Sequence, residues 1–394
     1  MRNPTRYKIA GVTLAVAAVA AAGTAWAMPA SASPPSAPNA LQQQVNAIRQ
    51  TGSVGVAAEV TGPAGRLFAN AGLADTATGT PVRSGDLFRI GSSTKTFVAT
   101  VMLQLVAEHK VSLDDTVAKW LPGVVTGNGN DGTKITIREL LQHTSGLYDF
   151  LDDFPEIDST ADYQADRFTT YTPEQLVAIA MRHAPDFAPG TSWEYSNTNY
   201  ILAGMIIQKA TGQSWQQEVT QRIIQPLGLH DTSAPTTSTV IPGPHLDGYS
   251  NFGAGPAIDV TALNPSAADA AGAMISSTDD LTRFYQALVT GKLLPAAQLA
   301  EMETTVPAPG LTSIWPGVRY GLGLMQIPLS CGGSYWAHGG DLPGYSTREG
   351  VTADGKRTAV VEETGVDVNS GLTTEHAMDS LIDQELCAPT ASGS

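Results

Sequence analysis

The stretch Arg89-Ile90-Gly91-Ser92-Ser93-Thr94-Lys95-Thr96-Phe97 decides how the rest of the chain is interpreted. It holds the only Ser-x-x-Lys of the sequence, and a helical pattern starts beside it. Apolar residues recur at the spacing of one helix face, at Phe97, Val101 and Leu105. The pattern predicts an amphipathic helix with Ser92 at its N-terminus and Lys95 one turn further on.

A serine at this place has a chemical use. The N-terminus of a helix offers free backbone N–H groups and the positive end of the helix dipole, which favour a developing negative charge. The amine of Lys95 would supply a group that takes or steers the proton of Ser92. The alternative is an N-cap serine followed by a surface lysine.

Length and composition indicate a globular protein. The 394 residues allow one large or two ordinary domains, and 42% hydrophobic and 15% charged residues argue against disorder. The formal net charge of −15 excludes binding to nucleic acid or to an anionic membrane by bulk electrostatics.

The N-terminal residues 1–32 have the pattern of an export signal. Basic Arg2, Arg6 and Lys8 precede an apolar run over 9–22, and small residues suited to cleavage follow. Cleavage would remove three basic and no acidic residues, so the mature charge would be about −18. A membrane anchor is the alternative, although the apolar run is short for a full span. Residues 33–39 are expected to form a linker, and the protein to be secreted without a stable membrane anchor.

The chain has two cysteines, Cys331 and Cys387. An even count in an exported protein predicts one disulfide bond, and two free buried thiols are the alternative.

The coarse pattern is mixed. Two strands joined by a Gly-Pro turn are expected over 54–60 and 66–71, capped helices dominate the middle, and strands return after about residue 318, including 320–324. A last helix is expected over 374–386. This order predicts an α/β (α+β) fold, an antiparallel sheet built from both termini and flanked by helices, with an inserted helical domain. The expected ranges are 40–105 with 275–388 for the sheet domain, 106–274 for the mainly helical domain and 389–394 for a tail.

Two further motifs support the first. One is Tyr195-Ser196-Asn197, in a loop rich in Pro and Gly, and the other is His338-Gly339-Gly340, on an expected strand. Taken alone, Tyr195 and Asn197 could be turn residues and His338 an ordinary strand histidine.

Together, Ser-x-x-Lys, Tyr-x-Asn and His-x-Gly in this order resemble the penicillin-recognising serine hydrolases. That group includes class C β-lactamases, D-alanyl-D-alanine carboxypeptidases, D-aminopeptidases, D-stereospecific peptidases and esterases. The motif spacing and the cysteine positions are most similar to the secreted actinomycete DD-carboxypeptidase/transpeptidase type. The resemblance covers nearly everything after residue 40 and implies the β-lactamase/DD-peptidase fold.

The resemblance also implies roles. Ser92 would attack a carbonyl and form an acyl-enzyme, with Lys95 buried against it. Tyr195 would act as the base, which needs cationic neighbours because a phenol titrates near pH 10; Lys95 and His338 are the candidates. Asn197 would hold the amide of the substrate's acyl side.

The oxyanion hole implied by the resemblance consists of backbone N–H groups. One donor would belong to Ser92 and the other to Asp341, next to Gly340 on the strand edge.

The chain departs from the carboxypeptidase pattern where that enzyme binds a free C-terminal carboxylate. An arginine and two threonines are replaced by Met325, Gly339 and Asp341. Because like charges repel, a substrate that is neutral at this point fits better. One alternative is that Asp341 or Glu349 holds a free ammonium, and another is that Arg319 or Arg348 restores the clamp.

These observations predict a secreted serine hydrolase for peptide, amide or ester bonds next to a D-amino acid. A DD-carboxypeptidase, an esterase, a weak β-lactamase and a penicillin sensor without turnover are the alternatives. β-Lactams are possible ligands. No cofactor is expected, and the seven histidines show no metal-binding spacing.

Overall fold

The computed structural model describes residues 37–154, 159–253, 255–365 and 371–388. The expected export signal (1–32) and tail (389–394) lie outside these ranges. Helix α1 (Ala37–Gln50) begins inside the stretch expected to be a linker, 33–39, so that linker is at least three residues shorter than expected. Its apolar residues face the sheet and are buried, at Leu41, Val45 and Ile48.

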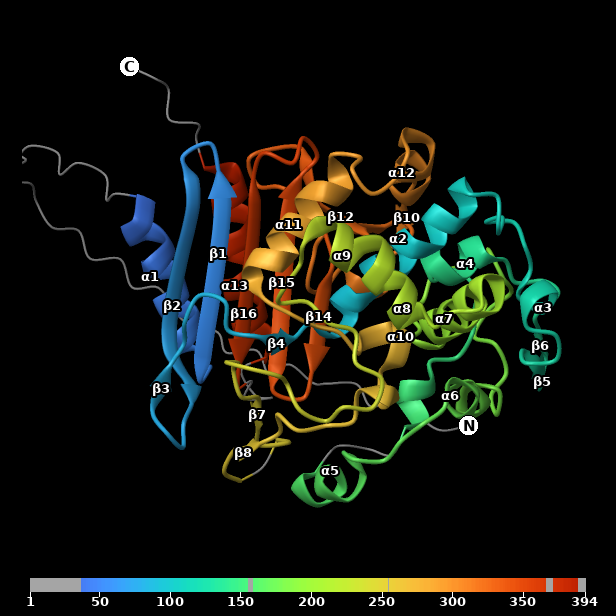
Figure 1. The fold of residues 1–394 in the computed structure, drawn as a ribbon, viewed down its shortest axis with the longest axis horizontal. Coiled ribbons are helices and arrows are strands. Elements are labelled where there is room, and N and C mark those ends of the chain that lie inside the picture. Colours follow the sequence, from blue (N-terminus) through green and yellow to red (C-terminus); the bar gives the residue numbers. More distant parts are fainter. Residues whose placement is uncertain (1–36, 155–158, 254, 366–370, 389–394) are drawn as a thin grey trace, which may run out of the picture. The chain divides into compact units, whose positions relative to one another are not determined.

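One large antiparallel sheet is built from both ends of the chain, as predicted (Figure 1). Its order is β10-β11-β12-β13-β15-β16-β1-β2-β3, and β14 pairs with β15. The N-terminal β1 lies beside the C-terminal β16, with Gly55 opposite Thr364. The strands are β1 (Gly55–Gly62), β2 (Gly65–Asp75), β3 (Thr80–Pro81), β10 (Val306–Pro307), β11 (Arg319–Tyr320), β12 (Met325–Pro328), β13 (Ser334–Ala337), β14 (Gly339–Leu342), β15 (Tyr345–Thr352) and β16 (Thr358–Thr364).

Helices cover both faces of the sheet. On one face α1 and α13 (Gly371–Cys387) pack on alternate residues of β1 and β16, including Val56, Ala58 and Val361. On the other face α11 (Thr278–Val289) packs on β1, β15 and β16 (Figure 1). Because successive side chains of a strand point to opposite faces of the sheet, the strands contribute to two separate hydrophobic clusters, one on each face.

Further helices lie along the middle of the chain and are separated by loops. They are α3 (Val117–Trp120), α4 (Ile137–Gln142), α5 (Thr160–Asp166), α6 (Pro173–Ala180), α7 (Thr198–Thr211), α8 (Trp215–Val219), α9 (Gln225–Leu227), α10 (Asp269–Gly272) and α12 (Ala296–Met302). The helical turns are η1 (Gly91–Ser93), η2 (Phe150–Asp153), η3 (Thr220–Ile224), η4 (Pro265–Ala267) and η5 (Pro309–Leu311). The short strands here are β4 (Phe88–Arg89), β5 (Thr126–Gly127), β6 (Asn130–Asp131), β7 (Tyr249–Ser250), β8 (Ile258–Asp259) and β9 (Ile275–Ser276).

Side-chain caps fix where several of these helices start. Reciprocal capping boxes begin α4, α6 and α8, where Thr136, Thr172 and Ser214 each accept a hydrogen bond from the backbone three residues on. All three follow from the sequence pattern. For α11 the cap is Ser277, whose side chain accepts a hydrogen bond from the backbone N–H of Asp280.

Helix α2 (Thr94–Ala107) differs from its prediction. It starts two residues after Ser92, which lies in the turn η1, and it is not amphipathic, because ten consecutive residues from Thr94 to Leu103 are buried. The helix runs through the interior and contacts α7, α10 and α12. Lys95 is therefore placed inside the protein by a helix that has almost no exposed face.

Two other expectations are corrected near the C-terminus. The strand expected over 320–324 is wrong: only Tyr320 lies in a strand, and residues 321–324 form the connection between β11 and β12, where Gly323 takes a left-handed turn (φ 72°). Cys331 and Cys387 form the predicted disulfide, and Cys387 is the last residue of α13 and does not follow it. The bond ties α13 to the β12–β13 turn.

No helix in the described ranges has both the length and the apolar character needed to span a bilayer.

Candidate active site

Ser92 and Lys95 are brought together by the junction of η1 and α2. The Lys95 amine donates a hydrogen bond of 2.9 Å to Ser92 Oγ. It also donates to Asn197 Oδ1 at 2.7 Å and to the Ala271 carbonyl oxygen at 2.8 Å. These three hydrogen bonds fix the Lys95 amine next to Ser92. The Lys95 side chain is completely buried.

Asn197 is fixed by a residue that the sequence analysis missed. Its Nδ2 donates a 2.8 Å hydrogen bond to Asp149 Oδ2, while its Oδ1 accepts from Lys95. Asp149 precedes η2 and accepts from the backbone of Leu151. The result is a hydrogen-bonded chain that leads from Ser92 through the buried Lys95 and Asn197 to a half-buried carboxylate. In the sequence, Asp149 directly follows the segment His-Thr-Ser-Gly-Leu-Tyr at 143–148, and this position is the one signal for it.

Burial sets the charge of Lys95. It lowers the pKa of the amine to about 7, and the Asp149 carboxylate opposes the shift. A large fraction of Lys95 is then neutral near pH 7. A neutral amine 2.9 Å from a hydroxyl can accept its proton.

Tyr195 lies on the other side of the lysine. The Lys95 nitrogen is 4.9 Å from the centre of the Tyr195 ring. Burial raises the pKa of Tyr195 well above its usual value, and interaction with the Ser92 hydroxyl opposes the rise. The phenol is therefore protonated in this state, and Lys95 is the better proton acceptor of the two.

His338 is not the cationic neighbour of Tyr195 that the sequence analysis considered. It lies at the break between β13 and β14, and its Nε2 is 2.8 Å from the hydroxyl of Tyr320. Burial lowers the pKa of His338 to about 3, so the ring is neutral at pH 7. His338 is buried and paired with the buried Tyr320.

His143 is a second residue whose place the sequence did not reveal. It ends α4 in the left-handed conformation (φ 61°), and its ring lies 4.2 Å from that of Tyr195. The backbone N–H groups of Glu194 and Ser196 donate to its carbonyl oxygen and its Nδ1. His143 thus binds the chain on both sides of Tyr195. In the sequence, the segment from His143 to Leu147 is typical only of a helix end and a turn.

Two glycines let the strand edge approach the serine. A Cβ atom at Gly340 would lie 1.9 Å from the Ile90 carbonyl oxygen and 2.7 Å from the Ser92 nitrogen. A Cβ atom at Gly91 would lie 2.7 Å from the Asp341 nitrogen. The N–H groups of Ser92 and Asp341 are therefore held next to each other, as two donors of an oxyanion hole must be.

Three of the proposed selectivity residues lie away from the cleft. Met325 is 2% exposed and packs in the hydrophobic cluster under α13. Glu349 is 1% exposed on the α11 face, where burial raises its pKa to about 8, and it is not among the residues that line the cleft beside Ser92. The Arg348 side chain fills the space beside Gly339: a Cβ atom added at Gly339 would lie 3.2 Å from Arg348 Cδ.

The two arginines considered as a replacement clamp are engaged elsewhere. Arg348 is buried and donates to Asp341 Oδ1 at 3.0 Å and to Glu375 Oε1 at 3.3 Å. Arg319 donates to the side chain and backbone of Thr305. The Asp341 side chain remains 61% exposed at the edge of the cleft.

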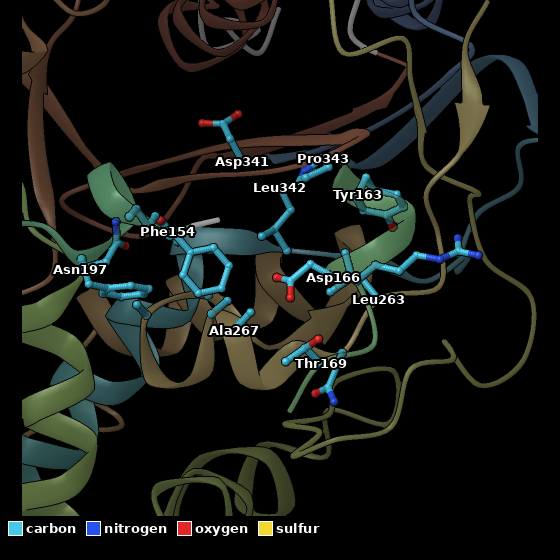
Figure 2. Close-up of a pocket in the computed structure, with 18 residues that line it drawn as sticks. Phe154, Tyr163, Asp166, Thr169, Asn197, Leu263, Ala267, Asp341, Leu342 and Pro343 are labelled. Carbon is cyan, nitrogen blue, oxygen red and sulfur yellow. The ribbon is translucent and has the colours of Figure 1, made fainter. Parts of the chain in front are cut away.

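A pocket of about 840 Å³ opens beside Ser92. In Figure 2 the side chains of Phe154 and Leu342 project into it, and the Asp166 carboxylate faces it from the far side. Tyr171 donates to both oxygens of that carboxylate. The walls are mostly apolar, formed by Phe150, Leu151, Phe154, Leu263 and Leu342. Within the ranges the structure describes, no group of three or more His, Cys, Asp or Glu residues is arranged to hold a metal ion.

Comparison with known proteins agrees with this geometry. The chain is 44% identical to a D-stereospecific amidohydrolase from Streptomyces sp., with a TM-score of 0.80 over 90% of this chain and 99% of that one. It is 29% identical to a D-amino acid amidase from Ochrobactrum anthropi SV3 solved with L-phenylalanine amide, with a TM-score of 0.76 over 88% and 97% of the two chains.

Among curated relatives, Esterase EstB of Burkholderia gladioli is 38% identical over 200 residues, which is 47% of this chain and 48% of the esterase's length. Residues 38–369 match the Beta-lactamase protein family. The buried Ser-x-x-Lys pair, the sheet built from both termini and this match place the chain in the β-lactamase family of serine hydrolases.

Proposed function

We propose that the protein is a secreted hydrolase that cleaves amide or ester bonds next to a D-amino acid through an acyl-enzyme on Ser92. In this proposal Lys95 accepts the proton of Ser92, and the backbone N–H groups of Ser92 and Asp341 stabilise the oxyanion. Tyr195, as a neutral phenol, then delivers its proton to the leaving group and takes up in exchange the proton that Lys95 received from Ser92. Asn197 holds both Lys95 and the acyl side of the substrate.

The observation that carries the proposal is the buried Lys95 amine. It is hydrogen-bonded to Ser92 at 2.9 Å, and its pKa is lowered to about 7. A structural lysine has no need of either feature, whereas a proton acceptor for a serine nucleophile needs both.

The D-amino acid in the proposal is supported by the two solved relatives whose titles name D-stereospecific or D-amino acid activity. The apolar walls of the pocket beside Ser92 suit a large apolar side chain, such as that of phenylalanine.

A free substrate carboxylate is disfavoured next to Asp341. The Arg348 guanidinium already binds two carboxylates, those of Asp341 and Glu375, so it has no charge to spare for a third. A neutral amide or ester in this place avoids repulsion of a few kcal/mol. An amidase or esterase is therefore preferred over a carboxypeptidase of cell-wall peptides.

An esterase is the second candidate, because the curated relative over 47% of the chain is one. A penicillin sensor that is acylated without turnover, or a weak β-lactamase, would use the same Ser92.

The test compares D-phenylalanine amide, its methyl ester, L-phenylalanine amide and N-acetyl-D-Ala-D-Ala as substrates. We expect turnover of the D-amide and D-ester, at least tenfold lower kcat/KM for the L-amide and the dipeptide acid, and none for Ser92→Ala. Preference for the dipeptide acid would establish the carboxypeptidase instead. Hydrolysis of esters alone would favour the esterase.

A further inference from the structure

A second pocket of about 630 Å³ shares a wall with the first. The residues from Asp341 to Pro343 line both pockets, so a substrate that reaches Ser92 along one side of this segment can place another group on the other side. In Figure 2 the Asp341 carboxylate is turned away from the centre of the first pocket. Three carboxylates line the second pocket, on Asp341, Glu363 and Glu375.

The sheet register places two of these carboxylates in one row. Asp341 on β14 lies opposite Ser346 on β15, which lies opposite Glu363 on β16. Ser346 donates its hydroxyl hydrogen to Asp341 Oδ1 at 2.5 Å. The row faces α13, which contributes Glu375.

The Glu363 carboxylate is buried without a hydrogen-bond donor among the described residues. Its side chain is 0% exposed, and neither carboxylate oxygen has a hydrogen-bond partner among the described residues. Its pKa is raised to about 7 by burial, which the nearby Ser53 hydroxyl opposes. A buried carboxylate without a donor costs several kcal/mol.

The local charge balance is negative. The residues that line the pocket include no lysine or arginine. The nearby Arg348 is bound to Asp341 and Glu375, so Glu363 shares its attraction with two other carboxylates and has no ion pair of its own. A bound cation with three N–H donors would supply what Glu363 lacks.

We propose that this second pocket is a subsite for a primary ammonium group of the substrate, which Glu363 binds together with Asp341 and Glu375. The inference rests on the proposed function for the part of the substrate at Ser92. It adds a specificity element: the enzyme selects acyl groups that carry a positive charge beside the apolar side chain.

The test uses a ladder of D-phenylalanine p-nitroanilides. The α-nitrogen is free or carries an ω-aminoacyl chain of two to six carbons, and each compound is paired with an isostere in which a methyl group or hydrogen replaces the ammonium. We expect one chain length at which kcat/KM of the ammonium compound exceeds that of its isostere at least tenfold. The ratio should fall to about 1 in Glu363→Gln and to a lesser extent in Glu375→Gln.

Glu362→Gln is the matched control. Glu362 is the neighbour of Glu363 on β16, is also 0% exposed, and faces α11 with its carboxylate bonded to Thr347. This variant should keep the wild-type ratio. A ratio near 1 at every length in the wild type, or an unchanged ratio in both Glu363→Gln and Glu375→Gln, would overturn the proposal.

The same pairs are titrated into Ser92→Ala by calorimetry, so that binding is measured without turnover. At least tenfold tighter binding of the ammonium compound supports the subsite even if the wild type hydrolyses no D-substrate, a result that would refute only the proposed function. Equal binding of every pair, including no binding by either member, would overturn the subsite.

Discussion

Replacement of Asp149 by asparagine should shift the pH dependence of the reaction. Two hydrogen bonds of 2.7 and 2.8 Å, joined by the amide of Asn197, place the Lys95 nitrogen at most about 8 Å from the Asp149 carboxylate. At an effective dielectric constant of about 20, this attraction is about 2 kcal/mol, or roughly 1.5 pKa units. Asp149 stabilises the protonated amine, so its loss lowers the pKa of Lys95 further below its value of about 7.

The assay is kcat/KM for D-phenylalanine amide between pH 4.5 and 9. Neutral Lys95 accepts the Ser92 proton, so activity in the wild type should fall as pH drops through about 7. In Asp149→Asn this acidic limb should move by one to two pH units to lower pH. Asp152→Asn, an exposed change in the adjacent turn, is the control for loss of one negative charge and should leave the limb in place. A limb that stays or moves to higher pH in Asp149→Asn would refute the assignment of Lys95 as the base.

The remaining predictions concern the same site and its support. Tyr195→Phe should lower kcat by about two decades or more, and adding Lys95→Ala should cost little further, since residues that act together are not additive; independent losses in steady-state kinetics would contradict a shared network. Gly340→Ala should lower kcat by at least tenfold with KM nearly unchanged, because a Cβ there would lie 1.9 Å from a backbone carbonyl oxygen beside the serine; wild-type kcat would count against the oxyanion role. Replacement of both Cys331 and Cys387 by serine should lower the free energy of unfolding by about 4 kcal/mol, measured in urea, because the bond closes a 56-residue separation; a loss below about 1 kcal/mol would show that the unfolded chain gains little freedom.

The sequence predicted those features that depend on local pattern. The hairpin of β1 and β2, the capping boxes of α4, α6 and α8, and the pairing of the two cysteines follow from residues close in sequence or from a simple count. The sheet built from both termini followed from the order of elements and from the family resemblance.

Features that depend on tertiary packing were not predictable in the same way. Helix α2 has the spacing of an amphipathic helix, but other helices and loops enclose its remaining faces. His338 carries the right motif, but its partner is Tyr320, eighteen residues away in sequence and on a neighbouring part of the sheet. Asp149 and Glu363 are ordinary acidic residues in the sequence, and only the fold shows that Asp149 accepts a hydrogen bond from Asn197 and that Glu363 is buried.

The central claim is that Ser92 forms an acyl-enzyme with a D-aminoacyl group. Its most direct test is intact-protein and peptide mass spectrometry after rapid acid quench of the protein mixed with D-phenylalanine methyl ester. We predict a mass increase of one phenylalanyl group, located on Ser92, with much less from the L-ester and none in Ser92→Ala. An adduct on another serine, or equal labelling by the two enantiomers, would contradict the account.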